Sequence, residues 1–180
     1  MANNSPKNVK LGVCKVFHNG VDLGFTKGGV EVTVETETHE VSVDQYGNTP
    51  IDEYITGRTA SVSVPLAETT LENLVAIMPG AQLVTDASTS GKSVLIPTGV
   101  GAKLADFAKE LILVPKGVNG TLDYKDAFRI PKAATPGAMT FAYRLDEERI
   151  FNCNFKAYPV VENDVEVLFQ VGEVKAPTAP

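Results

Sequence analysis

The segment with the widest chemical repertoire in this sequence is Thr89-Ser90-Gly91-Lys92-Ser93, which repeats the end of a phosphate-binding loop. In such loops, backbone N–H groups and the lysine hold phosphate oxygens. The motif also needs a glycine five residues before Gly91, and Asp86 occupies that position. No buried strand leads into the segment. We therefore interpret it as a flexible serine-glycine turn and not as a nucleotide site.

Histidine and cysteine offer little further chemistry. His18 and His39 lie beside polar residues, and neither has the nucleophile and orienting acid that a catalytic histidine needs. Both are expected to be solvated. Cys14 and Cys153 are far apart in the chain and form no C-x-x-C pair, so we expect two buried, reduced thiols. The sequence predicts no catalytic residue, no metal site and no cofactor.

Carboxylates are the residues whose placement is unusual. No lysine or arginine occurs between Lys27 and Arg58, whereas the rest of the chain holds 16 basic and 15 acidic residues. Since the formal net charge is −6, the acidity of the chain is local. A concentrated patch of one sign indicates a surface with a function. The seven acids of this window are Glu31, Glu35, Glu37, Glu40, Asp44, Asp52 and Glu53.

These acids do not have the setting of a hydrolase. Glu31, Glu35 and Glu37 share one face of a predicted strand. An acid catalyst is usually isolated in an apolar pocket that raises its pKa, whereas this face is expected to be solvated. The chain also has no tryptophan to form a platform for a sugar. We expect a protein that is not an enzyme.

Apolar residues recur at period two along most of the chain, which predicts a mainly β fold. Asn19-Gly20 is a strong hairpin signal, and Asp146-Glu147-Glu148 and Asn163-Asp164 predict two further turns. The apolar positions change from even (30, 32, 34) to odd (41, 43), so a bulge or turn is required between them. The predicted strands cover residues 10–17, 21–25, 30–37, 40–44, 58–66, 110–115, 127–131, 139–145, 149–158 and 165–171.

One α-helix is predicted at about residues 70–78. Thr69 and Glu72 have the spacing of a capping box, and Pro79-Gly80 ends the segment. The apolar stripe consists of Leu71, Leu74, Val75 and Met78. A weaker helical turn is expected at 104–108.

The 180 residues are expected to form a single domain, a β-sandwich or barrel with that one flanking helix. Residues 1–9 and 173–180 are expected to be loose. The first residues have no apolar segment after their lysines, which argues against a signal peptide. No run approaches the roughly 18 apolar residues of a membrane helix, so no membrane association is expected.

Several stretches, taken in order, resemble the major tail tube protein of long-tailed (siphovirus-type) bacteriophages. The resemblance covers about residues 10 to 172. It is carried by LGFTKGGV (23–30), the acidic strand, DQYGNTPID (44–52), GR (57–58), PLAETTLENL (65–74), FRIPKAA (128–134), ERI (148–150) and FKAY (155–158).

The resemblance implies a structural protein of the virion tail, made in the host bacterial cytoplasm. Subunits of that family form hexameric rings that stack into a tube around a tape measure protein, and tail terminator and tail tip proteins complete the tail. Double-stranded DNA passes through the lumen transiently, without sequence-specific binding. The same fold serves contractile tails and the type VI secretion system, so a type VI secretion-like tube protein is the nearest alternative.

In that setting the acidic strand has a physical role. Val30, Val32 and Val34 would pack on the core of the subunit, and the opposite face would line the lumen. A carboxylate wall repels phosphate and keeps the passage non-adhesive. The residues expected to face the lumen are Glu31, Thr33, Glu35, Glu37, Thr59, Ser61 and Ser63.

The second half of the acidic segment is expected to contact an adjacent subunit or ring, and part of 28–53 to be mobile before assembly. The predicted contact residues are Glu40, Asp44, Gln45, Tyr46, Asn48 and Asp52. Because this segment lacks cations, its counterpart should be basic; the candidates are Lys103, Lys109, Lys116, Lys125, Arg129 and Lys132.

An alternative of another class is a monomeric β-sandwich that acts as a binding or capsid decoration module. The acid row would then be a solvated sheet face whose charges discourage edge-to-edge aggregation.

Overall fold

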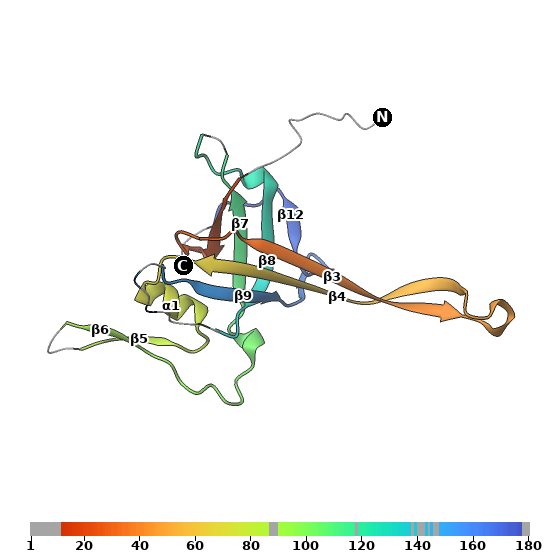
Figure 1. Ribbon diagram of the computed structural model, residues 1–180, viewed down its shortest axis with the longest axis horizontal. Coiled ribbons are helices and arrows are strands. Elements are labelled where there is room, and N and C mark those ends of the chain that lie inside the picture. Colours follow the sequence, from red (N-terminus) through yellow and green to blue (C-terminus); the bar gives the residue numbers. More distant parts are fainter. Residues whose placement is uncertain are drawn as a thin grey trace.

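The computed structural model describes residues 12–86, 90–117, 119–137, 139, 143, 145 and 148–177 (Figure 1). Its regular structure is mainly β, as the period-two pattern predicts, and this part of the chain contains one α-helix. Strand pairing is antiparallel throughout the described residues.

Most described strands belong to one large sheet with the order β2-β1-β7-β8-β9-β4-β3, and β12 pairs with β8. The sheet has free ends at β2 and β3, so it does not close into a barrel. Its strands are β1 (Cys14–His18), β2 (Val21–Asp22), β3 (Glu31–Ser42), β4 (Pro50–Leu66), β7 (Lys109–Pro115), β8 (Ala127–Ala134), β9 (Phe151–Ala157) and β12 (Gln170–Gly172).

Two small hairpins lie outside this sheet. One pairs β5 (Gln82–Thr85) with β6 (Lys92–Leu95), and the other pairs β10 (Val160–Glu162) with β11 (Val165–Val167). The predicted strand at 165–171 is therefore interrupted, because its second part pairs with β8 as β12. The described residues also include the 3-10 turns η2 (Asp44–Tyr46), η3 (Leu104–Asp106) and η4 (Tyr124–Asp126). The weak helical turn expected at 104–108 corresponds to η3.

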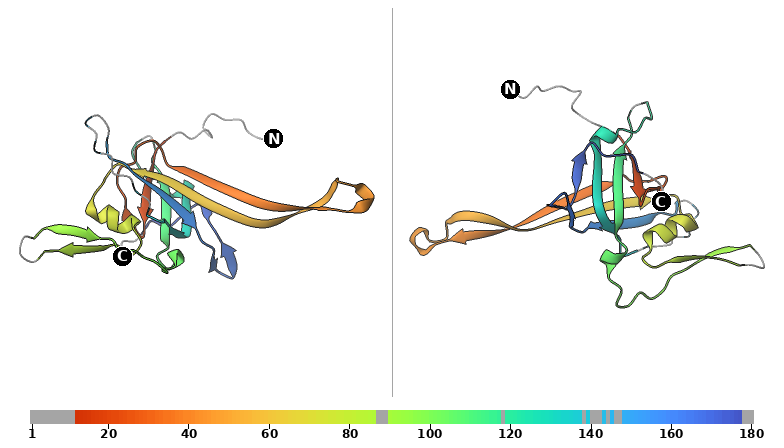
Figure 2. Two further views of the ribbon diagram at one scale, coloured as in Figure 1. Left: turned by 60° about the horizontal axis from the view of Figure 1, so that its bottom comes forward. Right: turned by 180° about the vertical axis from the view of Figure 1, so that it is seen from behind.

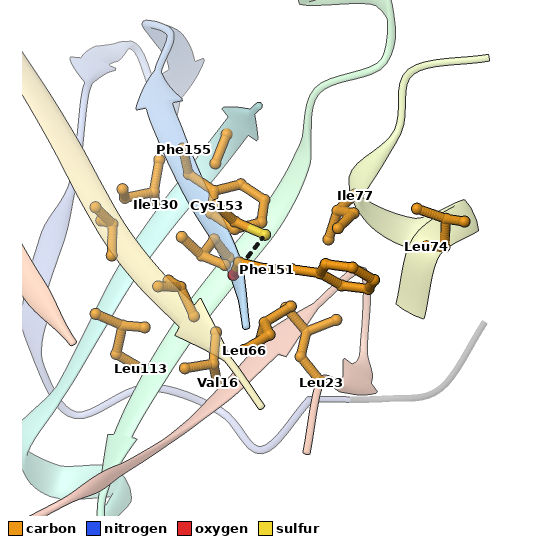
Figure 3. Close-up of a cluster of buried hydrophobic side chains, with 14 residues drawn as sticks. Val16, Leu23, Leu66, Leu74, Ile77, Leu113, Ile130, Phe151, Cys153 and Phe155 are labelled. Carbon is orange, nitrogen blue, oxygen red and sulfur yellow. Dashed lines mark hydrogen bonds between the residues drawn. The ribbon is translucent and has the colours of Figure 1, made fainter. Parts of the chain in front are cut away.

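The core forms where the sheet folds over on itself, as in a sandwich, so that β1, β7 and β8 face β4 and β9 (Figure 3). Val62 and Val64 are fully buried, which confirms the predicted inward face of β4. Phe155 and Phe151 are the largest side chains of this cluster. Cys153 lies beside them as a free thiol, and burial raises its pKa to about 12, which leaves it unreactive. Cys14 is also free and half-buried.

The helix α1 (Leu71–Ile77) covers one end of this core (Figure 1). The predicted cap is wrong by one residue, because the Thr70 hydroxyl, and not that of Thr69, accepts the N–H of Asn73 at 3.2 Å. The side chain of Asn73 is buried and donates to the carbonyls of Leu23 and Glu68, both at 2.9 Å. These bonds fix the helix to the loops on either side, and Leu74 and Ile77 supply its buried face.

The turns agree with their sequence signals where they are described. Asn19 and Gly20 both have positive φ (52° and 78°) and join β1 to β2, as a type I′ turn requires. Asn163 and Asp164, with φ of 51° and 63°, join β10 to β11 in the same way. Most of the predicted strand at 139–145, and the acids at 146–147 of the next turn, lie outside the described residues.

Near its end the chain differs from the expectation of a loose tail. Val174 is buried beside Ile112, Val114 and Ala127, and its N–H donates to the carbonyl of Tyr124 at 2.9 Å. The segment is anchored because β12 continues directly into this small apolar cluster. Residues 1–11 and 178–180 lie outside the described part of the chain.

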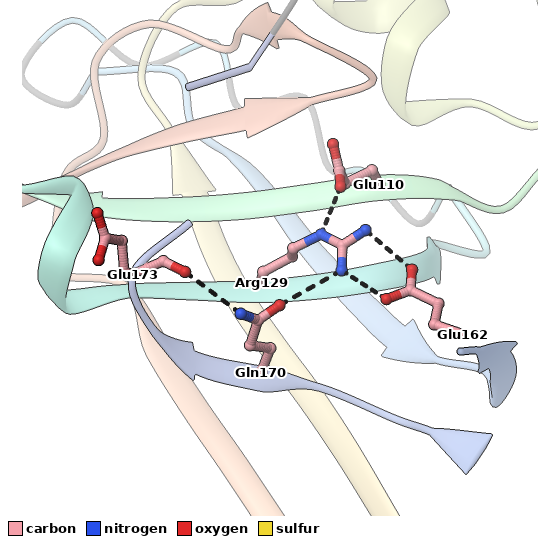
Figure 4. A network of polar contacts seen from close by, with 5 residues as sticks. All are labelled: Glu110, Arg129, Glu162, Gln170 and Glu173. Carbon is pink, nitrogen blue, oxygen red and sulfur yellow. Dashed lines mark hydrogen bonds and ion pairs between the residues drawn. The ribbon is translucent and has the colours of Figure 1, made fainter. Parts of the chain in front are cut away.

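A guanidinium joins four elements of the fold (Figure 4). Arg129 on β8 donates to both carboxylate oxygens of Glu162 at 2.9 Å, and its Nε donates to Glu110 on β7 at 2.6 Å. A longer bond of 3.4 Å reaches Gln170 on β12. The network holds the β10–β11 hairpin and β12 against the sheet. The hydrogen bond from Arg129 lowers the pKa of the Glu162 carboxyl. The bond to Glu162 raises the pKa of Arg129 most, and the bond to Glu110 raises it further.

Two hairpins leave the body of the molecule in opposite directions (Figures 1 and 2). The long β3–β4 hairpin extends along the longest axis, and the β5–β6 hairpin and α1 lie at the other end. No helix in the described residues is long and apolar enough to cross a membrane.

Candidate assembly surface

The β3–β4 hairpin brings the seven predicted lumen residues together on one face. In the register of the two strands, Glu31 lies opposite Ser63, Thr33 opposite Ser61 and Glu35 opposite Thr59. Glu37 follows on the same face, opposite Gly57. Directly opposite residues of an antiparallel pair share a face, and alternate residues along a strand do too. All seven are exposed or, for Ser61, half-exposed. We call this surface the acidic hairpin face.

The other face of the hairpin meets the core only near its base. Val30 and Val32 pack against the core, as predicted, and Val62 opposite Val32 is fully buried. The prediction for Val34 is wrong, because this side chain is 41% exposed. The hairpin leaves the body at this level, and on the next pair Arg58 donates to the hydroxyl of Thr36 in an exposed position.

A third strand adds polar groups to the acidic hairpin face that the sequence interpretation missed. β9 pairs with β4 so that Ser61 lies opposite Lys156 and Ser63 opposite Asn154. Both β9 residues are exposed, whereas Phe155 between them is buried. The alternation of residues 151–156, FNCNFK, predicted that Asn154 and Lys156 share the exposed face of a strand. The order of the strands was needed to place Lys156 beside Ser61. The face is therefore free of cations along the hairpin and has one ammonium group at its base.

A change of register lies where the parity of the apolar residues required one. The pairing shifts between Glu37 and Thr38, because Thr56 is an extra residue on β4. A register shift is confirmed in this interval, but the bulge expected within residues 34–41 is not on β3, which continues unbroken to Ser42 as the second predicted strand. The apolar positions of β3 therefore change from one face to the other. Beyond Ser42, η2 and Gly47 with φ of 62° close the hairpin.

All six predicted contact residues lie at the far end of the hairpin and are exposed: Glu40, Asp44, Gln45, Tyr46, Asn48 and Asp52. The structure adds apolar neighbours that the sequence interpretation missed. Ile51, Tyr54 and Ile55 are 53%, 60% and 63% exposed, and Tyr46 is 68% exposed. The sequence signal was the apolar pair at 54–55, directly after two acids.

The acids of this end have no cationic partner among the described residues. Glu40 and Glu53 lie directly opposite one another in the ladder. Like charges in this position destabilise a strand pair, and a neighbouring cation relieves the repulsion. The free subunit thus carries an unmatched negative charge here.

The basic candidates differ in their availability. Arg129 is excluded as a counterpart, because Glu110 and Glu162 already bind its guanidinium. The other candidates, Lys103, Lys109, Lys116, Lys125 and Lys132, form no ion pair with the described part of the chain.

No protein-family model matches this chain, and a search of curated proteins finds no match either. Among the described residues, no three histidine, cysteine or acidic side chains come together as metal ligands.

Proposed function

We propose that this protein is the structural subunit of a bacteriophage tail tube, which forms stacked hexameric rings whose lumen conducts viral DNA into the host during ejection. The observation that carries the proposal is the acidic hairpin face, whose seven residues lie together and face away from the core. The resemblance in sequence, read beside that geometry, supports this function above the others.

Ring formation uses the free edges of the sheet. β3 is a twelve-residue edge strand, and its outer side has no partner in the described chain. An exposed edge of this length is a template for pairing with another chain, and closure into a ring removes it. Repetition of one heterologous contact around an axis closes such a ring.

The acidic hairpin face has the electrostatics of a passage for DNA. Duplex DNA carries one negative charge per about 1.7 Å, and a basic wall would hold it through counterion release. The hairpin contributes Glu31, Glu35 and Glu37, and the neighbouring strand contributes the single cation Lys156. Three carboxylates against one ammonium group leave each subunit with a repulsive wall.

The expected partners follow from this role: other copies of the chain, the tape measure protein in the lumen during assembly, the tail terminator and tip proteins, and DNA in transit. The protein would act in the virion tail after synthesis in the host cytoplasm. It would use no cofactor.

Electron microscopy of the purified protein tests the proposal. We expect rings or tubes with an open lumen, alone or after addition of the tape measure and initiator proteins. A protein that stays monomeric at high concentration under all these conditions would contradict it and favour the monomeric binding or decoration module.

The role of the acidic hairpin face has its own test. Changing Glu31, Glu35 and Glu37 together to lysine should leave tubes able to assemble but reduce DNA delivery, measured as infectivity of the reconstituted phage. The same three residues changed to glutamine are the matched control, which removes repulsion without adding attraction. Normal infectivity of the lysine variant would refute the lumen assignment.

A further inference from the structure

We propose that the tip of the β3–β4 hairpin docks head to tail into an apolar groove beside α1 on a second copy of this chain. The basis is that tip and groove are complementary in apolar surface and charge and lie at opposite ends of the molecule. The inference deepens the proposed function, on which it rests, by assigning the receiving site of the contact.

The hairpin tip, residues 38–55, is both apolar and acidic. Ile55 shares a face with Glu53, two residues away, and Glu53 lies opposite Glu40. That face therefore presents a large, 63% exposed aliphatic side chain next to two opposed carboxylates. Tyr54 and Ile51 add exposed apolar area on the neighbouring positions. The tip contains no lysine or arginine.

The groove has a volume of about 470 Å³ and lies between the end of α1, the β1–β2 turn and the start of β7. Val75, Met78 and Phe107 supply much of its apolar lining. Lys109 is the single charged side chain among the described residues that line it, and it has no carboxylate partner in the described chain. An apolar cavity with one free cation matches an aliphatic side chain with two carboxylates.

His18 also lines the groove, but it is buried. Only 6% of the residue is exposed, so the expectation of a solvated histidine is wrong here. Its Nε2 is covered by the fold, and the groove therefore offers an incoming hairpin tip its apolar lining and the ammonium group of Lys109.

The two surfaces lie where a head-to-tail contact needs them. The tip is at one end of the longest axis, and α1 is at the other, in each view of Figures 1 and 2. A contact between different surfaces of identical subunits repeats along an axis as an open stack when its rotation does not close a ring. A second copy is thus the occupant that satisfies both surfaces at once. A different protein bound to either the tip or the groove would leave the other surface of each subunit without a partner.

Charge exchange tests the pairing of Glu53 with Lys109. In Lys109→Glu the groove repels the acidic tip, and in Glu53→Lys the tip repels the basic groove. We expect each single variant to raise the concentration needed for tube formation at least about tenfold, as loss of one close intermolecular charge pair predicts. Lys175→Glu is the control, because Lys175 is exposed, lies outside the groove and is not among the predicted basic counterparts; it should assemble like the wild type.

Two rescue experiments separate docking from misfolding. The double variant Lys109→Glu with Glu53→Lys should form tubes again, since its tip and groove have exchanged charges. The two single variants mixed in equal amounts should also assemble, because each supplies the partner that the other lacks. A photo-crosslinker in place of Ile55 should yield peptides from α1 and the start of β7.

The outcomes separate this inference from the proposed function. If the wild-type protein forms no rings or tubes, the proposed function fails. If it assembles but the charge exchanges have no effect, or crosslinks reach a different surface or a different protein, the docking assignment alone is refuted.

Discussion

The Arg129 network gives the sharpest stability prediction, because one substitution leaves two carboxylates without their partner. Arg129→Met keeps the aliphatic stem but removes the bidentate bond to Glu162 and the 2.6 Å bond to Glu110. The side chain of Arg129 is 20% exposed, and those of Glu162 and Glu110 are 33% and 37% exposed. The network thus lies between a surface ion pair and a buried one.

Breaking a buried pair costs about 3–5 kcal/mol, and an exposed pair contributes about 0–1 kcal/mol. For the intermediate burial of Arg129 we expect a loss of about 2 kcal/mol in the free energy of unfolding. In a domain of this size, that loss lowers Tm by about 4–8 °C. Urea denaturation at pH 7, followed by circular dichroism, measures the difference. Lys92→Met is the matched control, since the Lys92–Glu72 pair is exposed, and its midpoint should not move.

The pH dependence gives the sign of the effect. Hydrogen bonding to Arg129 lowers the pKa of Glu162 in the folded protein, so the stabilisation is complete above the ordinary carboxyl pKa of about 4.3 and disappears as the pH falls through the lowered value. The difference in the free energy of unfolding between wild type and Arg129→Met should therefore be complete at pH 7 and should become smaller below about pH 4. A loss under about 0.5 kcal/mol at pH 7, or a difference that does not become smaller in acid, would refute the reasoning.

Two further predictions concern the ends of the molecule. Burial lowers the pKa of His18, with Lys109 acting in the same direction, so the unfolded chain takes up the proton first. Stability should fall as the pH drops below about 6.5, the ordinary histidine pKa. His18→Leu should reduce this fall in urea unfolding at pH 7.5 and pH 5, and an unchanged slope would exclude His18 as its source. Hydrogen exchange should be faster for the amides of residues 38–55 than for those of 60–66 in the free subunit, because the hairpin tip contacts water on both faces. Assembly should then slow exchange at the tip; equal protection of both segments before assembly would contradict this view.

Local patterns determined much of the fold. The alternation of Val62 and Val64 with Ser61 and Ser63 predicted which face of β4 is buried, because side chains of a strand alternate whatever its neighbours are. The Asn19-Gly20 turn was predictable for the same kind of reason, since positive φ at two adjacent residues favours that pair. These features depend on residues close together in the chain.

The candidate site was predictable from local patterns only in part. The acidic row on β3 and the small polar row on β4 each follow from period two. Their meeting on one face depends on the register that places Glu31 opposite Ser63, which the sequence interpretation proposed only through a resemblance.

Tertiary structure alone decided which charges are matched. The sequence offered Arg129 as a free cation, but the neighbouring strands bring Glu110 and Glu162 to it. In the same way, the order of the strands places Lys156 beside the acidic hairpin face. The amino-acid sequence by itself determined the period, the turns and the local excess of acid, because each depends on neighbours along the chain. Strand order and register decided which of those groups meet, because they depend on contacts between residues far apart in the sequence.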